Sequence, residues 1–236
     1  MTSLAPVLEA FFTERLQQQR QASPHTIAAY RDTFRLLLGF AEKRLGKAPS
    51  DLLLADVDAP FVGAFLDHLE KDRGNGARTR NARLAAVRSF FRFAASREPA
   101  HAALIQRVLA IPEKRFDRDL VTFLSGPEVD AVLAVPDRST WLGQRDHALL
   151  LVAVRTGLRV SELTGLRIED CVLGAGPHVR CHGKGRKERC TPLDRDTVGA
   201  LRAWIKESGA KTSDYLFPSR RGGRLSTDAV ERLLAK

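Results

Sequence analysis

Apolar residues recur at every third or fourth position through much of the first hundred residues, which is the spacing of one face of an α-helix. Four such faces are visible: Leu4 to Leu16, Ile27 to Ala41, Phe61 to Leu69, and Leu84 to Ala94. Ser23 followed by Pro24 marks the start of the second helix, since serine caps helices and proline suits the first helical position. The pattern predicts an all-helical bundle over residues 1–98.

The periodic pattern is interrupted between the first hundred residues and the second half. Pro99, Pro112 and the mixed-charge stretch Glu113 to Asp119 flank a short apolar helix expected at Leu104 to Leu109. Prolines and charge runs of this kind favour a connection between domains. We therefore expect a linker over residues 99–118.

The second half predicts a mixed but mostly helical domain over residues 119–236. Ser125 and Glu128 form a capping box, and a strongly apolar helix ends at Gly157, a residue typical of helix C-termini. Segments of β character follow a short helix, and two more helices come after them. The expected elements are Arg145–Arg155, Val160–Leu166, the β segments Ile168–Val172, His178–Cys181 and Glu188–Leu193, and helices over Asp196–Glu207 and after Ser226. The expected fold class is mainly α with a small antiparallel sheet.

Charge adds a partner to this picture. Lys and Arg number 38 against 28 Asp and Glu, a net charge of +10. Arginine dominates the excess, and its guanidinium binds phosphate in a bidentate fork. Five arginines surround the fourth predicted helix: Arg78, Arg80, Arg83, Arg88 and Arg92. Like charges at such spacings repel, and a phosphate backbone would offset them; a solvated helix face is the alternative.

Other features constrain the cellular setting. The longest apolar run, Ala148 to Val154, is far too short to span a bilayer, and no secretion signal is visible. Three cysteines make an odd set that does not suggest a disulfide scaffold. We expect a cytoplasmic protein without a membrane partner.

Two motifs carry candidate chemistry. In the stretch Thr156 to Leu163, Arg159 stands at the start of a helix, and Glu162 can reach back to hold its side chain. Further on, Lys184 lies between two glycines at the expected tip of a β-hairpin, where an exposed turn can approach a groove closely. Each motif alone could be an ordinary salt bridge or charged turn. An arginine at a helix start followed by a hairpin lysine is much more specific.

These motifs resemble the tyrosine recombinase, or phage integrase, family, and the resemblance runs over essentially the whole chain. Ser23-Pro24-His25-Thr26 with Tyr30 resembles the helical core-binding domain, and Leu216-Phe217-Pro218-Ser219 resembles the approach to the next catalytic box. The resemblance implies two lobes that clamp double-stranded DNA. It also implies metal-free cleavage through a 3′-phosphotyrosine, with no cofactor.

The resemblance also assigns roles. Arg159 would be the first catalytic arginine, Lys184 the general acid for the leaving 5′-oxygen, and Glu162 a support for either. Further DNA contacts are expected from Arg186, Lys187 and Arg189 beside the hairpin.

The family also carries a His-x-x-Arg box and a later nucleophilic tyrosine, and neither follows Lys184 here. Tyr30 is expected in the helical core, and Tyr215 precedes the position of the missing box. We therefore expect a C-terminally truncated recombinase, such as an interrupted mobile element, that binds DNA without cleaving it. In solution without DNA we expect a monomer.

Three alternatives stay open. The chain could be a non-catalytic DNA-binding regulator, or an architectural partner of a full-length recombinase. A zinc site could use Cys171, His178, Cys181, His182 and Cys190, although no Cys-x-x-Cys pair exists, so our expectation is no metal. RNA binding has only the charge in its favour, since no aromatic stacking platform is visible.

Overall fold

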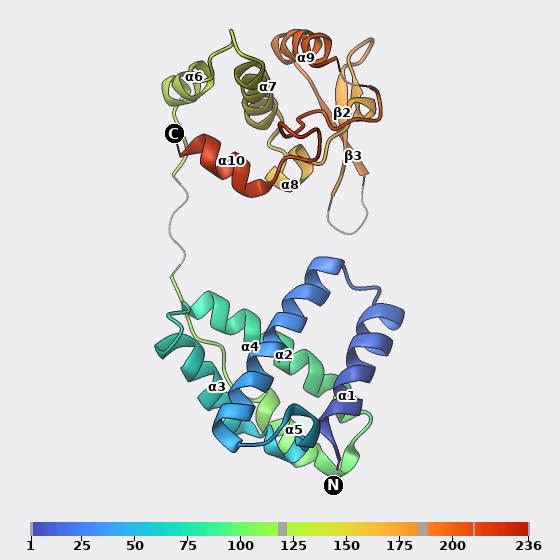
Figure 1. The fold of residues 1–236 in the computed structure, drawn as a ribbon, viewed down its shortest axis with the longest axis vertical. Helices are drawn as coiled ribbons and strands as arrows, with labels where there is room; N and C mark the ends of the chain where they lie inside the picture. Colours follow the sequence, from blue (N-terminus) through green and yellow to red (C-terminus); the bar gives the residue numbers. More distant parts are fainter. Residues whose placement is uncertain (1, 118–121, 184–187, 210, 236) are drawn as a thin grey trace. The chain divides into compact units, whose positions relative to one another are not determined.

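The computed structural model describes residues 2–117, 122–183, 188–209 and 211–235. The chain divides into two compact units, Met1–Leu120 and Val121–Lys236, drawn in Figure 1. Each unit has a hydrophobic core of its own.

Helices that pack around one core form the first unit. They are α1 (Leu4–Ala10), the π-helix η1 (Phe11–Gln19), α2 (Pro24–Leu45), α3 (Ala59–Lys71), α4 (Ala77–Ala95) and α5 (Ala102–Leu109), with short 3₁₀ turns η2 (Pro49–Asp51), η3 (Leu54–Asp56) and η4 (Pro99–His101). The predicted start of α2 is confirmed, since the Ser23 hydroxyl accepts a hydrogen bond from the Thr26 N–H at 3.2 Å. Phenylalanine rings pack at the centre of the core. The ring centroids of Phe34 and Phe90 lie 5.4 Å apart, and both rings contact Phe11.

The prediction of a regular helix from Leu4 to Leu16 is wrong in its second half, where the chain forms the π-helix η1. There the Arg20 N–H donates to the Arg15 carbonyl, five residues back, at 3.0 Å. Phe11 and Leu16 are also five residues apart, and both are fully buried. In an α-helix this spacing would turn one of them away from the core, whereas the wider π turn places both on the same face.

The segment expected to be a linker contributes to the first unit. Within it, α5 buries Ile105 and Val108 completely against α3 and α4. Segment 99–109 thus packs as part of the helical core. The domain boundaries expected at residues 98 and 118 stay predictions.

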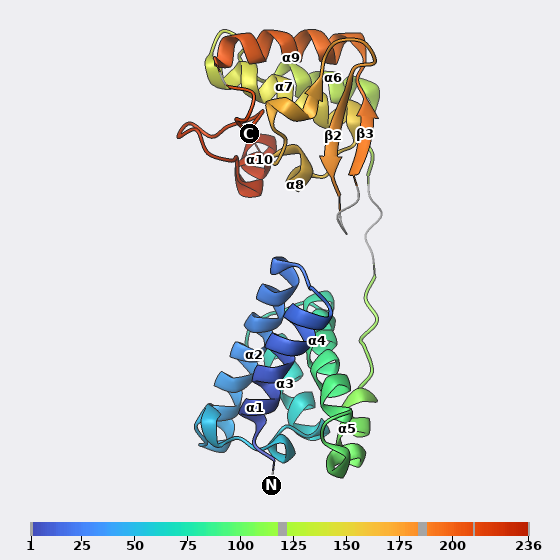
Figure 2. The same ribbon diagram turned by 90° about the vertical axis from the view of Figure 1, so that its right-hand side faces the viewer.

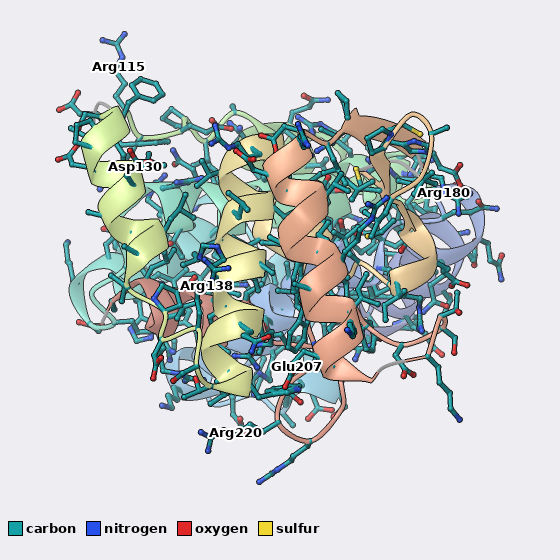
Figure 3. The ribbon with its side chains drawn as sticks, turned by 90° about the horizontal axis from the view of Figure 1, so that it is seen from above. Arg115, Asp130, Arg138, Arg180, Glu207 and Arg220 are labelled. Carbon is teal, nitrogen blue, oxygen red and sulfur yellow. The ribbon has the colours of Figure 1, made fainter. Side chains whose placement is uncertain are left out.

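In the second unit, helices pack around a small sheet. The elements are α6 (Gly126–Ala134), α7 (Trp141–Thr156), α8 (Val160–Leu163), the 3₁₀ turn η5 (Ile168–Asp170), β1 (Cys171–Val172), β2 (His178–His182), β3 (Glu188–Pro192), α9 (Arg195–Ser208) and α10 (Thr227–Leu234). The strands are antiparallel in the order β1-β2-β3. Figure 3 shows α7 between α6 and α9, and Figure 2 shows β2 and β3 beside each other.

The core of the second unit lies under α7 and α9, where Trp204 is almost fully buried and donates its indole N–H to the Leu216 carbonyl at 2.7 Å. The predicted capping box is present, because the Glu128 carboxylate accepts from both the N–H and the hydroxyl of Ser125 at 2.7 Å. The segment from Ile168 differs from the strand predicted there, since its first residues form η5. The predicted fold class, mainly helical with a small antiparallel sheet, is confirmed.

Candidate functional site

Arg159 stands where α7 ends and α8 begins. Gly157 closes α7 in a left-handed conformation with φ of 61°, which glycine adopts without steric cost. Two residues later Arg159 takes the N-cap position of α8, and its backbone N–H donates to the Glu162 carboxylate at 2.9 Å. Its guanidinium donates to the same carboxylate at 2.9 Å, while the side chain remains 64% exposed. The arginine is therefore held at one edge and open to solvent elsewhere.

Glu162 also binds a second arginine, from the sheet. Arg189 on β3 donates to both oxygens of the Glu162 carboxylate, at 2.8 and 3.3 Å. The Glu162 side chain is only 5% exposed. One buried carboxylate thus joins the start of α8 to β3 and fixes two guanidinium groups relative to each other.

The surroundings of Glu162 keep it ionised. Burial by itself would raise the pKa of this carboxyl group, but the hydrogen bonds from the Arg159 N–H, the Arg159 guanidinium and Arg189 outweigh burial. The net result is a pKa below the ordinary glutamate value. The carboxylate therefore remains a charged acceptor for both arginines at neutral pH.

The expected hairpin is present where the structure describes it. Strands β2 and β3 pair antiparallel up to His182 opposite Glu188. The predicted site residues Lys184, Arg186 and Lys187 lie outside the described residues. Arg189, also expected to contact DNA, is the one cation of this predicted group that lies within the described residues. It binds Glu162.

A second layer of arginines surrounds this site. Arg224 donates to the Ser161 carbonyl at 2.5 Å and to the Thr164 hydroxyl at 3.2 Å, which ties the segment before α10 to α8. Arg180 on β2 donates to the Glu169 carbonyl at 3.0 Å. Both line a pocket of about 160 Å³ that also reaches Glu162. Sequence reasoning did not select these two residues, because their partners are neutral acceptors distant in sequence.

The five arginines of α4 fall into two groups. Arg80 is buried and lies 3.4 Å from the Glu70 carboxylate. Arg83 donates to the Ala29 carbonyl and the Thr33 hydroxyl, each at 3.0 Å. Arg88 donates to the Ile111 carbonyl, and to Glu113 at 3.1 Å. All three guanidinium groups are thus held by contacts within the unit, and for Arg80 and Arg88 a carboxylate also offsets the charge.

Arg78 and Arg92 form the second group. Both are exposed, and neither has an ion-pair partner among the described residues. The argument from uncompensated charge therefore still applies to these two. A DNA contact by any of the five arginines stays a prediction.

Arg88 and Asn81 of α4 hold the chain that leaves α5. Asn81 donates to the Lys114 carbonyl at 2.7 Å and accepts from the Lys114 N–H at 3.0 Å. The Lys114 ammonium binds Glu70 at 2.7 Å. With the Arg88 contacts to Ile111 and Glu113, these bonds anchor residues 111–114 to the first unit.

Both tyrosines have structural contacts. Tyr30 is half-buried and stacks on Phe11, with ring centroids 6.2 Å apart, as expected for a core residue. Tyr215 is also half-buried, and the Arg167 guanidinium lies 4.8 Å from its ring centroid. Arg167 and Tyr215 also pair as an isolated β-bridge.

The cysteines of the zinc alternative differ in their surroundings. Cys181 is buried in the core and Cys190 is exposed on the neighbouring strand. Burial, reinforced by the Asp170 carboxylate, raises the pKa of the Cys171 thiol to about 12. In the part of the chain that the structure describes, no three His, Cys, Asp or Glu side chains gather as metal ligands would. Among the same residues, no helix combines the length and apolarity needed to cross a bilayer.

Comparison with known families matches both units. Residues 122–236 match the phage integrase family, and residues 10–98 match the phage integrase N-terminal SAM-like domain. The chain is 61% identical over 234 residues to "Putative integrase/recombinase y4rC" of Sinorhizobium fredii, covering 99% of this chain and 70% of that protein. It is 35% identical over 224 residues to tyrosine recombinase XerC of Xanthomonas axonopodis, covering 93% of this chain and 72% of that protein.

Solved structures share the fold at lower identity. A lambda integrase (75–356) dimer bound to a COC′ core site has a TM-score of 0.68 at 20% identity, over 100% of this chain and 80% of that one. The XerH site-specific recombinase in a post-cleavage complex with difH substrate has a TM-score of 0.67 at 23% identity, over 92% and 64% of the two chains.

Proposed function

This chain belongs to the phage integrase family of tyrosine recombinases, and from that premise we propose that residues 1–236 bind double-stranded DNA and carry part of a strand-cleavage site. The residues of that part are Arg159, Lys184 and Glu162. The observation that supports the proposal is the bridging carboxylate of Glu162, which holds Arg159 in place with most of its side chain exposed.

Arg159 is the group that would face the scissile phosphate. A guanidinium fixed before the substrate arrives stabilises developing negative charge without the cost of reorienting. Glu162 and Arg189 together supply this fixation, because one carboxylate accepts hydrogen bonds from both arginines. The two arginines with one carboxylate carry a net positive charge, so the site attracts phosphate instead of repelling it. In this assignment Lys184 protonates the leaving 5′-oxygen.

The proposal separates binding from cleavage for residues 1–236 taken alone. No histidine follows Lys184 in this sequence, so no His-x-x-Arg box is available there. The two tyrosines are engaged elsewhere, Tyr30 against Phe11 and Tyr215 against Arg167. Without a nucleophile placed at the phosphate there is no covalent step for Arg159 to accelerate.

DNA binding is tested by a gel shift with duplex DNA at several salt concentrations. We expect binding that weakens steeply with salt, because arginine contacts to phosphate release counterions. Arg159→Gln should weaken binding, whereas Arg107→Gln, an exposed arginine on α5, should not. Absence of any shift at low salt would overturn the proposal.

The same separation supports a second role, as a regulator or partner of a full-length recombinase. A chain that occupies recombination sites without a nucleophile would lower the rate of an active relative acting on the same DNA. Adding residues 1–236 to such a reaction should inhibit it in proportion to site occupancy, and a variant that fails to bind DNA should not inhibit. In this role the chain is a cytoplasmic monomer without DNA, and light scattering measures that oligomeric state directly.

A further inference from the structure

A basic pocket lies on the first unit. It is separate from Arg80, Arg83 and Arg88, the α4 arginines whose partners lie within the unit. It has a volume of about 390 Å³ and lies between η1 and the C-terminal half of α4. Its polar lining comprises Arg15, Gln19, Arg20, Ser89, Arg92, Ser96 and Arg97. The pocket therefore presents four guanidinium groups together with neutral hydrogen-bonding side chains.

The charges in this pocket are only partly compensated. Arg97 binds the Glu14 carboxylate and lies 4.7 Å from the ring centroid of Phe93, so its position is fixed. Arg15 donates to the neutral amide of Gln19 at 3.1 Å. For Arg15, Arg20 and Arg92, no carboxylate partner occurs among the described residues. Three neighbouring cations without a counter-charge repel one another until an anion joins them.

The unusual backbone of η1 brings two of these cations together. In an α-helix, residues five apart point in different directions, whereas the wider π turn places them on one side. Arg15 and Arg20 are five apart and joined by the π-type hydrogen bond of 3.0 Å. The chain then turns at Gln21, which has φ of 43°, a conformation that a residue with a side chain adopts only at a cost.

We propose that this pocket binds a phosphate oxyanion, supplied by the backbone of the duplex DNA that the chain binds. Arg20 from the end of η1 and Arg92 from α4 would hold the phosphate from two sides, with Arg15 as the third cation. Guanidinium groups suit this ligand because each can offer two parallel N–H donors to a phosphate. The choice of DNA as the source rests on the proposed function, while the phosphate chemistry follows from the pocket itself.

The first test compares two double variants that have the same net charge. Arg20→Gln with Arg92→Gln removes two cations of the pocket, and both side chains are exposed. Arg44→Gln with Arg107→Gln removes two exposed cations elsewhere on the unit. Circular dichroism and thermal unfolding establish that both variants fold.

Duplex binding is then measured between about 50 and about 200 mM salt. Removal of one phosphate interaction makes the fall in affinity over this range about three- to four-fold smaller. Because Arg20 and Arg92 hold the same phosphate, the pocket variant should show a fall about three- to four-fold smaller than that of the unaltered chain. The control variant should retain nearly the full salt dependence. If both double variants have the same salt dependence, DNA is not the ligand of this pocket.

The second test uses inorganic pyrophosphate, followed through the Nε–H resonances of arginine in the full chain. Saturable shifts that disappear in Arg20→Gln with Arg92→Gln would show a phosphate site even if the duplex experiment fails, and would identify a free phosphate compound as its ligand. Failure of both measurements would overturn the pocket proposal. Retained DNA binding by the unaltered chain in that case would leave the proposed function standing.

Discussion

Two regions of the molecule, one in each unit, use arginine in contrasting ways. In the second unit, Arg159 and Arg189 share the single buried carboxylate of Glu162, and each is oriented by it. In the pocket between η1 and α4, Arg15, Arg20 and Arg92 have no carboxylate partner among the described residues. In the first arrangement the carboxylate fixes the positions of the two guanidinium groups and neutralises part of their charge. In the second arrangement the positive charge is not neutralised.

This difference indicates what each region can do. Fixed donors matter where charge develops on one particular phosphate, because their value depends on alignment. Uncompensated cations matter for affinity along a backbone, where each neutralised phosphate contributes through counterion release. We therefore expect substitutions of Glu162 to alter the stability of the second unit and the orientation of Arg159 and Arg189, and substitutions in the pocket to alter salt-dependent binding.

The largest effect on stability should come from Glu162→Gln. It removes the buried charge that three hydrogen-bonded groups share, and we expect a loss of about 2 kcal/mol in the free energy of unfolding. Denaturant titration measures this loss. Glu169→Gln, on η5, changes a glutamate whose side chain is not buried, and it should change the same quantity by less than about 0.5 kcal/mol. Equal losses in the two variants would show that Glu162 does not organise the site.

A smaller effect should appear as coupling between Glu162 and Arg189. A double-mutant cycle with Glu162→Gln and Arg189→Met should give an interaction free energy of about 1 kcal/mol, because the two residues touch directly. The cycle with Arg195→Met, on α9, should give a value near zero. Simple additivity for the Glu162 and Arg189 pair would contradict the bridge.

In the first unit, Asn81→Ala tests whether α4 anchors the chain that leaves α5. Without the two hydrogen bonds to Lys114 the segment should be less stable locally by about 1 kcal/mol, and trypsin should then cleave after Lys114 or Arg115 about five-fold faster. Asn75→Ala, in the turn between α3 and α4, serves as the control. An unchanged cleavage rate for Asn81→Ala would mean that the anchor contributes nothing.

The smallest expected effect is a dependence on pH. Because the pKa of Glu162 is lower in the folded chain than its ordinary value, ionised Glu162 stabilises the fold above that ordinary value. This stabilisation is lost as the pH falls through the lowered pKa. The difference in unfolding free energy between the unaltered chain and Glu162→Gln should thus be constant from about pH 7 to about pH 5, and should shrink in part as the pH falls to about 3. A difference that stays constant down to about pH 3 would place the effect of Glu162 elsewhere.

Sequence reasoning succeeded where the partners are close along the chain. The caps at Ser23 and Ser125 and the contact from Glu162 back to Arg159 all join residues three positions apart, so helix geometry alone predicts them. The order and type of most elements followed from hydrophobic spacing in the same way.

Other features depend on the tertiary fold and have no local signal. Arg189 meets Glu162 from 27 residues away, and only the pairing of β2 with β3 brings it there. The partners of Arg88 lie beyond α4, on the segment after α5. The π-helix follows from the need to bury both Phe11 and Leu16, which a helical spacing pattern does not reveal.

The central claim is that residues 1–236 bind DNA at a partial cleavage site that has no nucleophile. One nicked suicide substrate, analysed from a single incubation on a native and on a denaturing gel, tests it most directly. A full-length relative that contains the His-x-x-Arg box and the later tyrosine serves as the positive control. We predict a shifted complex on the native gel and no protein–DNA adduct after denaturation. An adduct that survives denaturation, or the absence of a shifted complex, would contradict the claim.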